Sequence, residues 1–459
     1  MQKTVIAEVS SYISRSGQAE LPPEVIIKAK HHILDSITSM VSGSILKSGK
    51  LAREFIKAQK GVKEAQVIGS GIITSAINAA LSNGTMAHAD ETDDSHEKSL
   101  THPGAAVVPA ALAVAERERA NGTRFLKGVV AGYDIGCRIT QALGVDAIRK
   151  QGRSTHSLGG TFGAAAAAAS IAALKEELVC YVLSYAAHQA SGALYYVRDT
   201  EHVEKAFVFA GMPARNGVTA AVLVQAGFTG VSDPFTGDRN FFDSFPTTAN
   251  LARLMEGLGS RYEIMETNIK KFTVGSPIQA PVDALLTLMA KHALIVQHIE
   301  SIAVHLPDAR SLNTVNNRDM PDINLQYLLA ATLLDGKLTY EAAHSYERMR
   351  DPAVVEVKKR ISLIADPDLL KIASTERQAL VQVTMKDGRQ LKEQVTAVRG
   401  TAGNPLSTQE VENKCRDLLT PVLGRERTDI LIDRIWHLEK VTNMRNLRPL
   451  LRVPQHPTS

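Results

Sequence analysis

The segment Met86 to Ala106, MAHADETDDSHEKSLTHPGAA, concentrates three histidines and five carboxylates in 21 residues. Neutral imidazole and ionised carboxylate serve both as metal ligands and as groups that move protons. Metal ligands usually recur at one-turn spacing or in HExxH-like pairs, whereas His88, His96 and His102 are separated by eight and six residues. The pattern leaves three interpretations open: a catalytic loop, a metal site, or a surface loop that caps helices.

The last histidine of this segment directly precedes an apolar stretch, THPGAAVVPAALAVAE, in which Pro103 and Gly104 mark the start of a helix. Asp93-Asp94-Ser95 should break the preceding helix, which puts His96 and His102 on a loop. A helix N-terminus favours an anionic ligand, because its backbone N–H groups are free and its dipole end is positive. We therefore expect His102 to lie where an anionic substrate can bind.

A second polar segment, QGRSTHSLGGTFGAAAAAA (151–169), carries His156 in front of three glycines and an Ala-rich helix. It lacks the GxGxxG spacing that follows a strand in dinucleotide-binding folds. Glycines in this position let the backbone approach a ligand or another helix closely. His156 is either a site residue or a hydrogen-bonded bystander at the cap of a core helix.

Candidate cations flank an apolar stretch between His202 and Gly230, where Lys205 precedes the sequence Met-Pro-Ala-Arg-Asn-Gly at 212–217. This sequence is typical of a turn that opens a helix, from which Arg215 could clamp a carboxylate. A structural salt bridge explains Arg215 equally well. Lys270 and Lys271 are further candidates where the sequence pattern changes.

Tyr327 lies within an otherwise apolar helical stretch, DINLQYLLAATLLDG. Most tyrosines of this kind are core residues with a satisfied hydroxyl group. The remainder donate a proton or a hydrogen bond in a site.

Helices must position most of these residues, since apolar side chains recur with the 3.6-residue period through the first 260 residues. One helix is expected in LPPEVIIKAKHHILDSITSMVSG (21–43). Others are expected at 48–60, 73–88, 105–120, 123–143, 160–173, 177–193 and 215–226. The fold class is therefore mainly α.

The pattern changes after about Thr267. Residues 299–307 and 378–398 alternate in the manner of strands, and the second segment turns back at Lys386-Asp387-Gly388. Two helical stretches, 323–336 and 340–350, lie between them, and Ser407 to Glu410 offer N-caps for a returning helix. We expect a helical domain from residues 1–266 and 403–459, with an α+β domain inserted at 267–402.

Composition narrows the choice of partners. Of 459 residues, 44% are hydrophobic and 22% charged, and the net charge of +4 is too small to indicate nucleic acid or membrane binding. The three cysteines belong to no CxxC grouping, so no disulfide framework or metal knuckle is expected. The first residues lack an apolar signal region, and we expect a cytoplasmic protein whose partners are small molecules or a second copy of itself.

Four stretches together resemble the MmgE/PrpD family in order and approximate spacing: NGTMAHADETDDSH with THPGAAVVPAALAVAE, GGTFGAAAAAA, GMPARNGVTAAVLVQAGFTG and QYLLAATLLDG. The family includes 2-methylcitrate dehydratase, cis-aconitate decarboxylase and iminodisuccinate epimerase. The resemblance implies a helical domain built from both chain ends, an inserted α+β lid, and a homodimer. It also implies an active site between the domains that needs neither metal nor organic cofactor.

Residues carry over from the family only where the motif matches. His102 matches the catalytic histidine, and Glu91 occupies the place of the usual catalytic aspartate. Ser95 matches the end of the same loop. Ser154 stands where relatives commonly carry a histidine, for which His156 is the nearest replacement. Among the substrate-binding positions, Lys205 is offset by one, Gln279 replaces a frequent lid histidine, and Lys271 matches. Tyr327 also matches, at a catalytic position.

The resemblance implies chemistry at a carbon next to a carboxylate, where a base removes the proton or CO2 leaves. We expect Glu91 or His102 as the base and His156 or Tyr327 as the acid. The carboxylate-binding residues would be Ser95, Lys205, Arg215, Lys271 and Gln279. The expected function is a cofactor-independent lyase for a small di- or tricarboxylate, first a 2-methylcitrate dehydratase-like hydro-lyase.

Alternatives to that hydro-lyase are an epimerase or isomerase and a decarboxylase of a related dicarboxylate. Two further alternatives belong to other classes. One is a metal-dependent hydrolase that uses His88, Asp93, Asp94 and His102. The other is a binding protein without activity.

Overall fold

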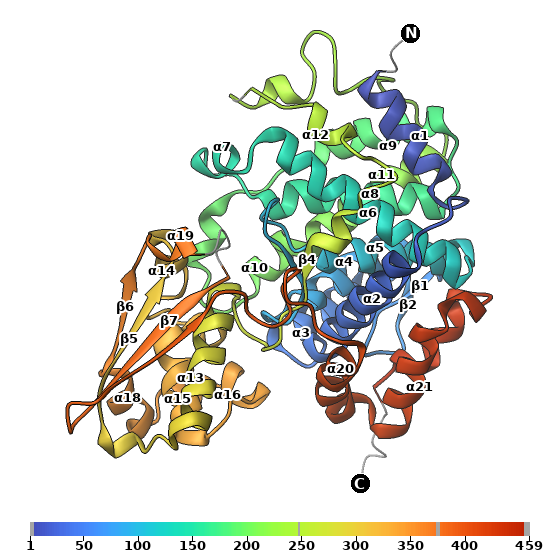
Figure 1. The fold of residues 1–459 in the computed structure, drawn as a ribbon. Coiled ribbons are helices and arrows are strands. Elements are labelled where there is room, and N and C mark those ends of the chain that lie inside the picture. The colour runs from blue at the N-terminus through green and yellow to red at the C-terminus, as the bar shows by residue number, and fades with distance from the viewer. Residues whose placement is uncertain (1–3, 247, 373–376, 454–459) are drawn as a thin grey trace. The chain divides into compact units, whose positions relative to one another are not determined.

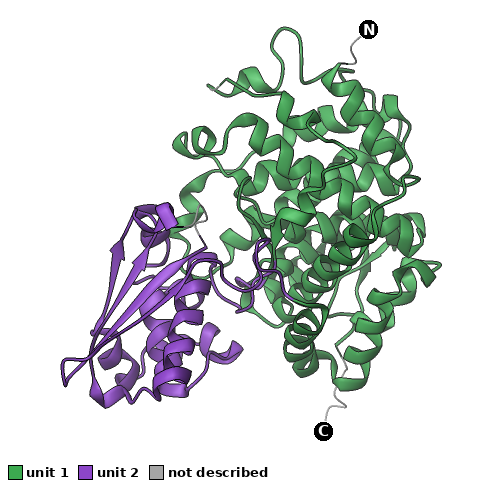
Figure 2. Cartoon of the chain, in the orientation of Figure 1, with its two compact units in different colours: residues 1–89, 93–268, 407–459 green, residues 90–92, 269–406 purple. Residues whose placement is uncertain are grey.

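The computed structural model describes residues 4–246, 248–372 and 377–453. The chain divides into two compact units (Figure 2). The helical unit contains residues 1–89, 93–268 and 407–459, and the α+β unit contains residues 90–92 and 269–406. The sequence pattern put the corresponding boundaries at 266/267 and 402/403, and it did not separate residues 90–92 from their neighbours.

The helical unit is built from long helices with four short strands at its loops (Figure 1). Its helices are α1 (Val5–Ser16), α2 (Pro23–Gly43), α3 (Lys47–Gln59), α4 (Ala76–Ala87), α5 (Pro103–Glu118), α6 (Gly122–Leu143), α7 (Val145–Lys150), α8 (Thr155–Ile171), α9 (Glu176–Gln189), α10 (Glu204–Ala206), the π-helix η2 (Phe207–Gly211), α11 (Met212–Gln225), α12 (Ala252–Met255), α20 (Thr408–Leu423) and α21 (Arg425–Trp436). The strands β1 (Ala65–Gln66) and β2 (Ile73–Thr74) form one antiparallel pair, and β3 (Ser95–His96) and β4 (Thr267–Asn268) form another. Short 3-10 helices are η1 (Leu194–Arg198), η3 (Phe242–Ser244), η4 (Glu263–Glu266), η8 (Leu438–Lys440) and η9 (Met444–Leu451).

The predicted helices of this unit are confirmed, with ends shifted by a few residues. The prediction at 73–88 was wrong at its start, because Ile73 and Thr74 form β2 and α4 begins at Ala76. The expected capping box is present: the Ser407 hydroxyl accepts from the Glu410 backbone N–H, and the Glu410 carboxylate accepts from that of Ser407. These signals are local, which is why the sequence reveals them.

Helices α6 and α8 approach each other through glycines. A Cβ atom at Gly136 would lie 2.6 Å from the Gly159 carbonyl oxygen, and one at Gly163 would lie 2.7 Å from that of Gly132. Any larger residue would push the backbones apart. The Ala-rich run after Gly163 is fully buried, so α8 is the closely packed core helix that its composition predicts.

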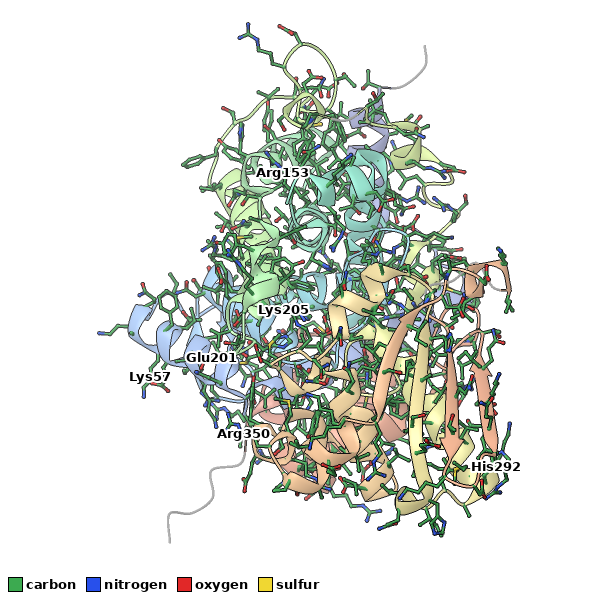
Figure 3. The ribbon with its side chains drawn as sticks, turned by 90° about the vertical axis from the view of Figure 1, so that its left-hand side faces the viewer. Lys57, Arg153, Glu201, Lys205, His292 and Arg350 are labelled. Atoms are coloured by element: carbon green, nitrogen blue, oxygen red, sulfur yellow. The ribbon has the colours of Figure 1, made fainter. Side chains whose placement is uncertain are left out.

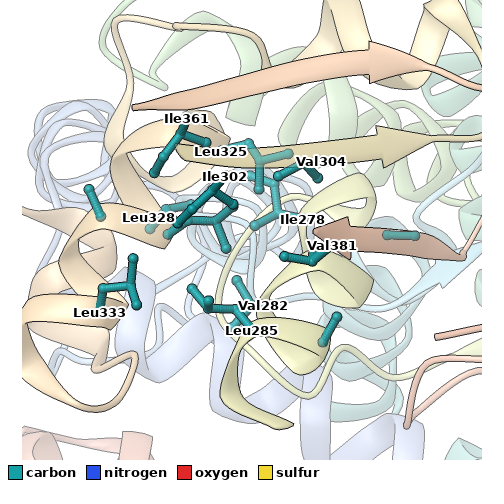
Figure 4. Packing of buried hydrophobic residues seen from close by; sticks show 14 of the residues in the cluster. Ile278, Val282, Leu285, Ile302, Val304, Leu325, Leu328, Leu333, Ile361 and Val381 are labelled. Atoms are coloured by element: carbon teal, nitrogen blue, oxygen red, sulfur yellow. The ribbon is translucent and has the colours of Figure 1, made fainter. Parts of the chain in front are cut away.

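The α+β unit has a four-stranded sheet in the order β6-β5-β7-β8. Its strands are β5 (Ile299–Leu306), β6 (Ile361–Ala365), β7 (Ala379–Met385) and β8 (Gln390–Val395). The helices are α13 (Gln279–His292), α14 (Ala309–Val315), α15 (Leu325–Asp335), α16 (Tyr340–His344), α17 (Tyr346–Met349), α18 (Pro352–Lys358) and α19 (Leu369–Ile372), with 3-10 turns η5 (Ser276–Ile278), η6 (Val296–His298) and η7 (Pro321–Ile323). One apolar core joins the sheet to α13 and α15 (Figure 4).

The hairpin β7–β8 and strand β5 are confirmed. Strand β6 was missed: it pairs parallel to β5, with Ile302 opposite Ile361. A parallel partner comes from a distant part of the chain and leaves no hairpin signal.

Within the described residues, one continuous helical stretch, Glu204–Gln225, is long and apolar enough to cross a membrane by length and composition alone. It combines α10, η2 and α11. Of its apolar window, 67% is buried inside the fold, which is typical of a core helix.

Candidate active site

The acidic loop of the helical unit is anchored by Asp94. Its Oδ1 accepts a hydrogen bond from the Gly104 backbone N–H at 2.9 Å, and its Oδ2 accepts from the Tyr133 hydroxyl at 2.6 Å. Burial lowers the pKa of His32 to about 4, so the ring is neutral and its Nδ1–H donates to the same Oδ2 at 2.8 Å. Asp94 thus fixes the loop to α2, α5 and α6.

The start of α5 admits only glycine at its second residue. A Cβ atom at Gly104 would lie 2.4 Å from Ser36 Oγ, 2.5 Å from Tyr133 Oη and 2.8 Å from Asp94 Oδ2. Pro103 occupies the first helical position, where its missing N–H costs nothing. His102 is the N-cap residue of α5, as the sequence predicts, and its ring is therefore held at a rigid helix start.

Asp93 joins two histidines. Its Oδ2 lies 2.9 Å from Nδ1 of His88, the C-cap residue of α4, and 3.0 Å from Nδ1 of His102. The side chains of Asp93 and His88 are fully buried, whereas that of His102 is 11% exposed. His102 is therefore the member of this trio that a solute can reach.

Phe209 organises the imidazoles around it. Its ring stacks on His88 at 4.3 Å and 7°, and on His156 at 3.8 Å and 17°. Two parallel rings at these distances occupy opposite faces, so Phe209 is sandwiched between them. The His102 ring lies edge-on to Phe209 at 5.4 Å and to His156 at 5.1 Å.

The π-helix η2 carries Phe209 and is followed by Pro213 in α11. In the π register the Val208 carbonyl would accept from residue 213, but Pro213 has no N–H. The Ser157 hydroxyl donates to that carbonyl instead, at 2.9 Å. The expectation of a turn at 212–217 was wrong, because the helix continues from α10 through η2 into α11.

Two glycines bring α4 against η2. A Cβ atom at Gly84 would lie 2.8 Å from the Ala210 carbonyl oxygen, and one at Gly211 would lie 2.2 Å from Thr85 Oγ1. The contact places His88, at the end of α4, against Phe209. Glycine at both positions is thus needed for the stack to form.

His156 joins the cluster from the first turn of α8, where Ser154 is the N-cap residue. Burial, together with electrostatic interactions with His102 and Arg149, holds the pKa of His156 well below its usual value. Its buried Nδ1 has no hydrogen-bond partner in the described part of the chain. His156, rather than Ser154, supplies the imidazole at this place.

Lys205 lies on α10 (Figure 3). Its Nζ is 5.4 Å from the centre of the Phe209 ring, which puts a cation beside the cluster. Its backbone N–H donates to Asp199 Oδ2 at 2.9 Å. Glu201, in the same loop, forms an ion pair with Lys47 of α3. Lys205 is therefore held by local loop structure and adds a cation to the histidine cluster.

Sequence reasoning gave no role to His202. The residue is buried, has a left-handed φ of 56°, and its ring lies 5.2 Å from that of His88. A buried non-glycine residue in this conformation is held there by its surroundings. The proximity of His202 to Lys205 in sequence was the available signal.

His96 belongs to a separate buried pair. Burial alone would lower its pKa, but the charges of Cys137 and Glu263 and hydrogen bonds to them raise the pKa of His96 to about 10. Its Nε2 lies 3.1 Å from Glu263 Oε2. His96 lies on β3 and not in a loop, so its role is structural. Ser95, its neighbour on β3, is buried and pairs in register with Asn268.

The structure does not bring Arg215 to the histidines. Its guanidinium donates to Asn216 Oδ1 at 2.9 and 3.1 Å and lies 6.0 Å from the Phe207 ring. This local contact replaces the carboxylate clamp that the sequence suggested.

Glu91 and its cation lie in the α+β unit. Glu91 Oε2 is 3.1 Å from Nζ of Lys270, and both side chains are buried at 5% and 2% exposure. Lys271 points elsewhere: its Nζ is 2.7 Å from Asp283, and its side chain is 39% exposed. Of the two adjacent lysines, Lys270 and not Lys271 is thus the one that pairs with Glu91.

Two further site predictions fall in structural positions of this unit. The side-chain amide of Gln279 accepts from the Phe272 backbone N–H and donates to the carbonyls of Phe272 and Val274, so it pins its own loop. The Tyr327 hydroxyl donates to the Ala342 carbonyl inside the apolar core, and burial raises the pKa of Tyr327 to about 12. Neither environment supports the predicted role in binding or proton donation.

Comparison with known proteins identifies the family of the chain. Family models match the MmgE/PrpD N-terminal domain over residues 7–253 and the MmgE/PrpD C-terminal domain over residues 272–438. Similar relatives are a cis-aconitate decarboxylase-like protein, oryM, of Aspergillus oryzae, 24% identical, and the cis-aconitate decarboxylases of Aspergillus terreus, 21% identical, and Homo sapiens, 24% identical. The alignments cover 97%, 98% and 100% of this chain and 97%, 96% and 96% of those proteins.

Proposed function

Because the chain belongs to the MmgE/PrpD family, we propose that it is a lyase that acts on a small di- or tricarboxylate, with His102 as the base that removes a proton next to a carboxylate. One observation carries this proposal. His102 is the exposed member of a histidine–aspartate pair whose carboxylate is fully buried. The relatives whose names include cis-aconitate decarboxylase support a carboxylate as the substrate.

The Asp93–His102 bond makes His102 a competent base. When Nδ1–H donates to Asp93 Oδ2, the lone pair of the imidazole is on Nε2. The carboxylate then stabilises the imidazolium ion that forms when Nε2 takes up a proton. The second bond of Asp93, to His88, prevents the carboxylate from turning away.

The proton removed from the substrate leaves a carbanion, which needs positive charge or hydrogen-bond donors near the adjacent carboxylate. Lys205 offers an ammonium group beside the cluster. His156 is held neutral, so it can donate a hydrogen bond as a neutral imidazole but does not supply a proton as an imidazolium ion. The sequence suggested His156 as a general acid. We propose instead that His156 stabilises the carbanion through a hydrogen bond.

The fate of the carbanion decides the reaction. Loss of a hydroxide from the next carbon gives a hydro-lyase of the 2-methylcitrate dehydratase type, our first choice from the sequence. A decarboxylase, in which CO2 leaves and the carbanion is protonated, is favoured by the names of the relatives. Both reactions pass through a carbanion next to a carboxylate, but they use His102 differently. In the hydro-lyase neutral His102 takes up the substrate proton, whereas in the decarboxylase the carbanion forms by loss of CO2 and protonated His102 returns a proton to it.

The test is a survey by NMR of proton exchange and turnover in deuterated water, with 2-methylcitrate, cis-aconitate and related carboxylates. We expect exchange or product with at least one of them, and a fall of about 10² to 10⁴-fold in His102→Asn. His437→Asn is the matched control, because His437 forms a similar ion pair with Asp433 on the surface of α21. Unchanged turnover in His102→Asn would refute the assignment of the base.

A further inference from the structure

The histidine cluster also has the composition of a transition-metal site. One donor atom from each of His88, Asp93 and His102 lies within 4.8 Å of the others, and both Nδ1 atoms face the same Asp93 oxygen. In a tetrahedral zinc site with bonds of 2.0 to 2.1 Å, neighbouring ligand atoms are ~3.3 Å apart. The two nitrogen–oxygen distances, 2.9 and 3.0 Å, are shorter by only a few tenths of an ångström.

We propose that His88, Asp93 and His102 bind Zn²⁺ or a similar transition-metal ion, and that the ion blocks His102 as a base. The first half of this proposal stands on the geometry of the cluster alone. The second half rests on the proposed function.

Binding and inhibition are linked by the position of one proton. A metal ion that takes Nδ1 of His102 displaces the hydrogen that this atom donates to Asp93. In a neutral imidazole that hydrogen moves to Nε2, the atom that carries the lone pair in the free enzyme. Metal binding therefore protonates the nitrogen that would attack the substrate, with no net release of a proton from either histidine.

The surroundings of the trio provide for a fourth ligand. His102 is 11% exposed, so a water molecule or a substrate carboxylate can complete the tetrahedron. The His156 ring, 5.1 Å from that of His102, carries a buried Nδ1 without a partner among the described residues. In the tautomer that carries its hydrogen on Nε2, this nitrogen has a lone pair with which it can bind an ion.

The donor set also predicts selectivity. Two imidazoles and one carboxylate suit Zn²⁺, Co²⁺ and Ni²⁺, whereas Mg²⁺ and Ca²⁺ prefer all-oxygen sites. The ammonium group of Lys205 lies beside the cluster and opposes any cation, so a weakly bound ion should not be retained. Mg²⁺ is thus the natural negative control.

Calorimetric titration of metal-free protein with Zn²⁺ tests binding. We expect one ion per chain, no heat with Mg²⁺, and at least tenfold weaker binding in Asp93→Asn and in His102→Asn. Asp433→Asn is the matched control, since it alters the exposed Asp433–His437 pair and should leave the affinity unchanged. Equal affinity in wild type and in both cluster variants, or failure of Zn²⁺ to bind wild type, overturns the site. Circular dichroism shows whether Asp93→Asn or His102→Asn has lost its fold. If one has, the zinc affinity of the other variant decides whether the site exists.

Co²⁺ provides a signal that a loose surface ion does not give. Bound by the trio, Co²⁺ should show the intense visible absorption of a tetrahedral ion, lost in Asp93→Asn. A weak spectrum like that of hydrated Co²⁺ would overturn the proposed geometry.

Turnover measurements separate this inference from the proposed function. If the metal-free protein is fully active and loses activity in proportion to Zn²⁺ occupancy, the result supports both the proposed lyase and its inhibition by Zn²⁺. Zn²⁺ binding that leaves turnover unchanged overturns the inhibition and leaves the lyase intact. Activity that appears only with metal refutes the metal-free proton transfer and favours a metal-dependent hydrolase. If no carboxylate is turned over, the calorimetric and Co²⁺ results still show whether His88, Asp93 and His102 bind a metal ion.

Discussion

Asp93 Oδ2 lies 3.0 Å from Nδ1 of His102, and the carboxylate is fully buried while the imidazole is 11% exposed. This difference in exposure distinguishes Asp93 from His102. The sequence alone does not show which of its adjacent acidic residues contacts the histidine. In the proposed reaction the buried Asp93 orients the imidazole, and the exposed His102 takes up the proton. Asp94, one residue further, holds the loop to three helices through His32, Gly104 and Tyr133.

Asp93→Asn should lower kcat by about 10² to 10⁴-fold with little change in folding stability. The asparagine keeps the size of the side chain, but it can turn its NH2 toward His102 and thereby favour the wrong tautomer. The measurement is steady-state kinetics as a function of pH, with Asp433→Asn as the control. A variant with normal kcat would show that Asp93 does not orient the base.

Phe209→Leu should reduce turnover about threefold to tenfold, since the stack on His88 and His156 contributes roughly 0.5 to 1.5 kcal/mol per ring pair. It should also lower the free energy of unfolding. Phe162→Leu is the control, because Phe162 is equally buried but contacts Phe235 and Phe241 instead of the histidines. We expect Phe162→Leu to reduce stability and leave kcat unchanged. Equal kinetic losses in the two variants would argue against a positioning role for Phe209.

Lys270→Met should destabilise the protein by about 3 to 5 kcal/mol, because it leaves the Glu91 carboxylate buried without its cation. Lys271→Met breaks a partly exposed pair and should cost about 0 to 1 kcal/mol. Chemical denaturation of both variants measures the difference. Similar losses would contradict the burial that distinguishes these adjacent lysines.

Asp134 makes stability depend on pH. Burial raises the pKa of Asp134 to about 7 in the folded protein, in spite of hydrogen bonds from the Tyr12 hydroxyl and the Glu263 backbone N–H. A carboxyl group whose pKa is raised by folding stabilises the folded state most below about pH 4. Its contribution is lost as the pH rises through about 7.

The denaturation midpoint should therefore fall between pH 4 and 8 in the wild type, and the part of this fall due to Asp134 should vanish in Asp134→Asn. Denaturant titrations of both proteins at pH 5 and pH 8 measure the change in the midpoint. An identical pH dependence in the two proteins would rule out Asp134 as the titrating group.

The sequence by itself determined the features whose causes are local. The helices follow from periodicity, the β7–β8 hairpin from its Lys-Asp-Gly turn, and the start of α20 from the capping box between Ser407 and Glu410. His102 was identified as a helix-start residue for the same reason, because Pro103 and Gly104 are its neighbours. The MmgE/PrpD resemblance was also readable, since it rests on several motifs in order.

Only the tertiary structure decided which of these residues form a cluster. Phe209 and His202 received no role from the sequence. The approach of Phe209 to His88 depends on the glycine contact between α4 and η2, and His202 reaches His88 from the loop before α10. Lys270 and Lys271 are chemically identical in the sequence. One is buried and the other exposed, because adjacent residues leave the backbone in different directions and packing selects which one faces the interior.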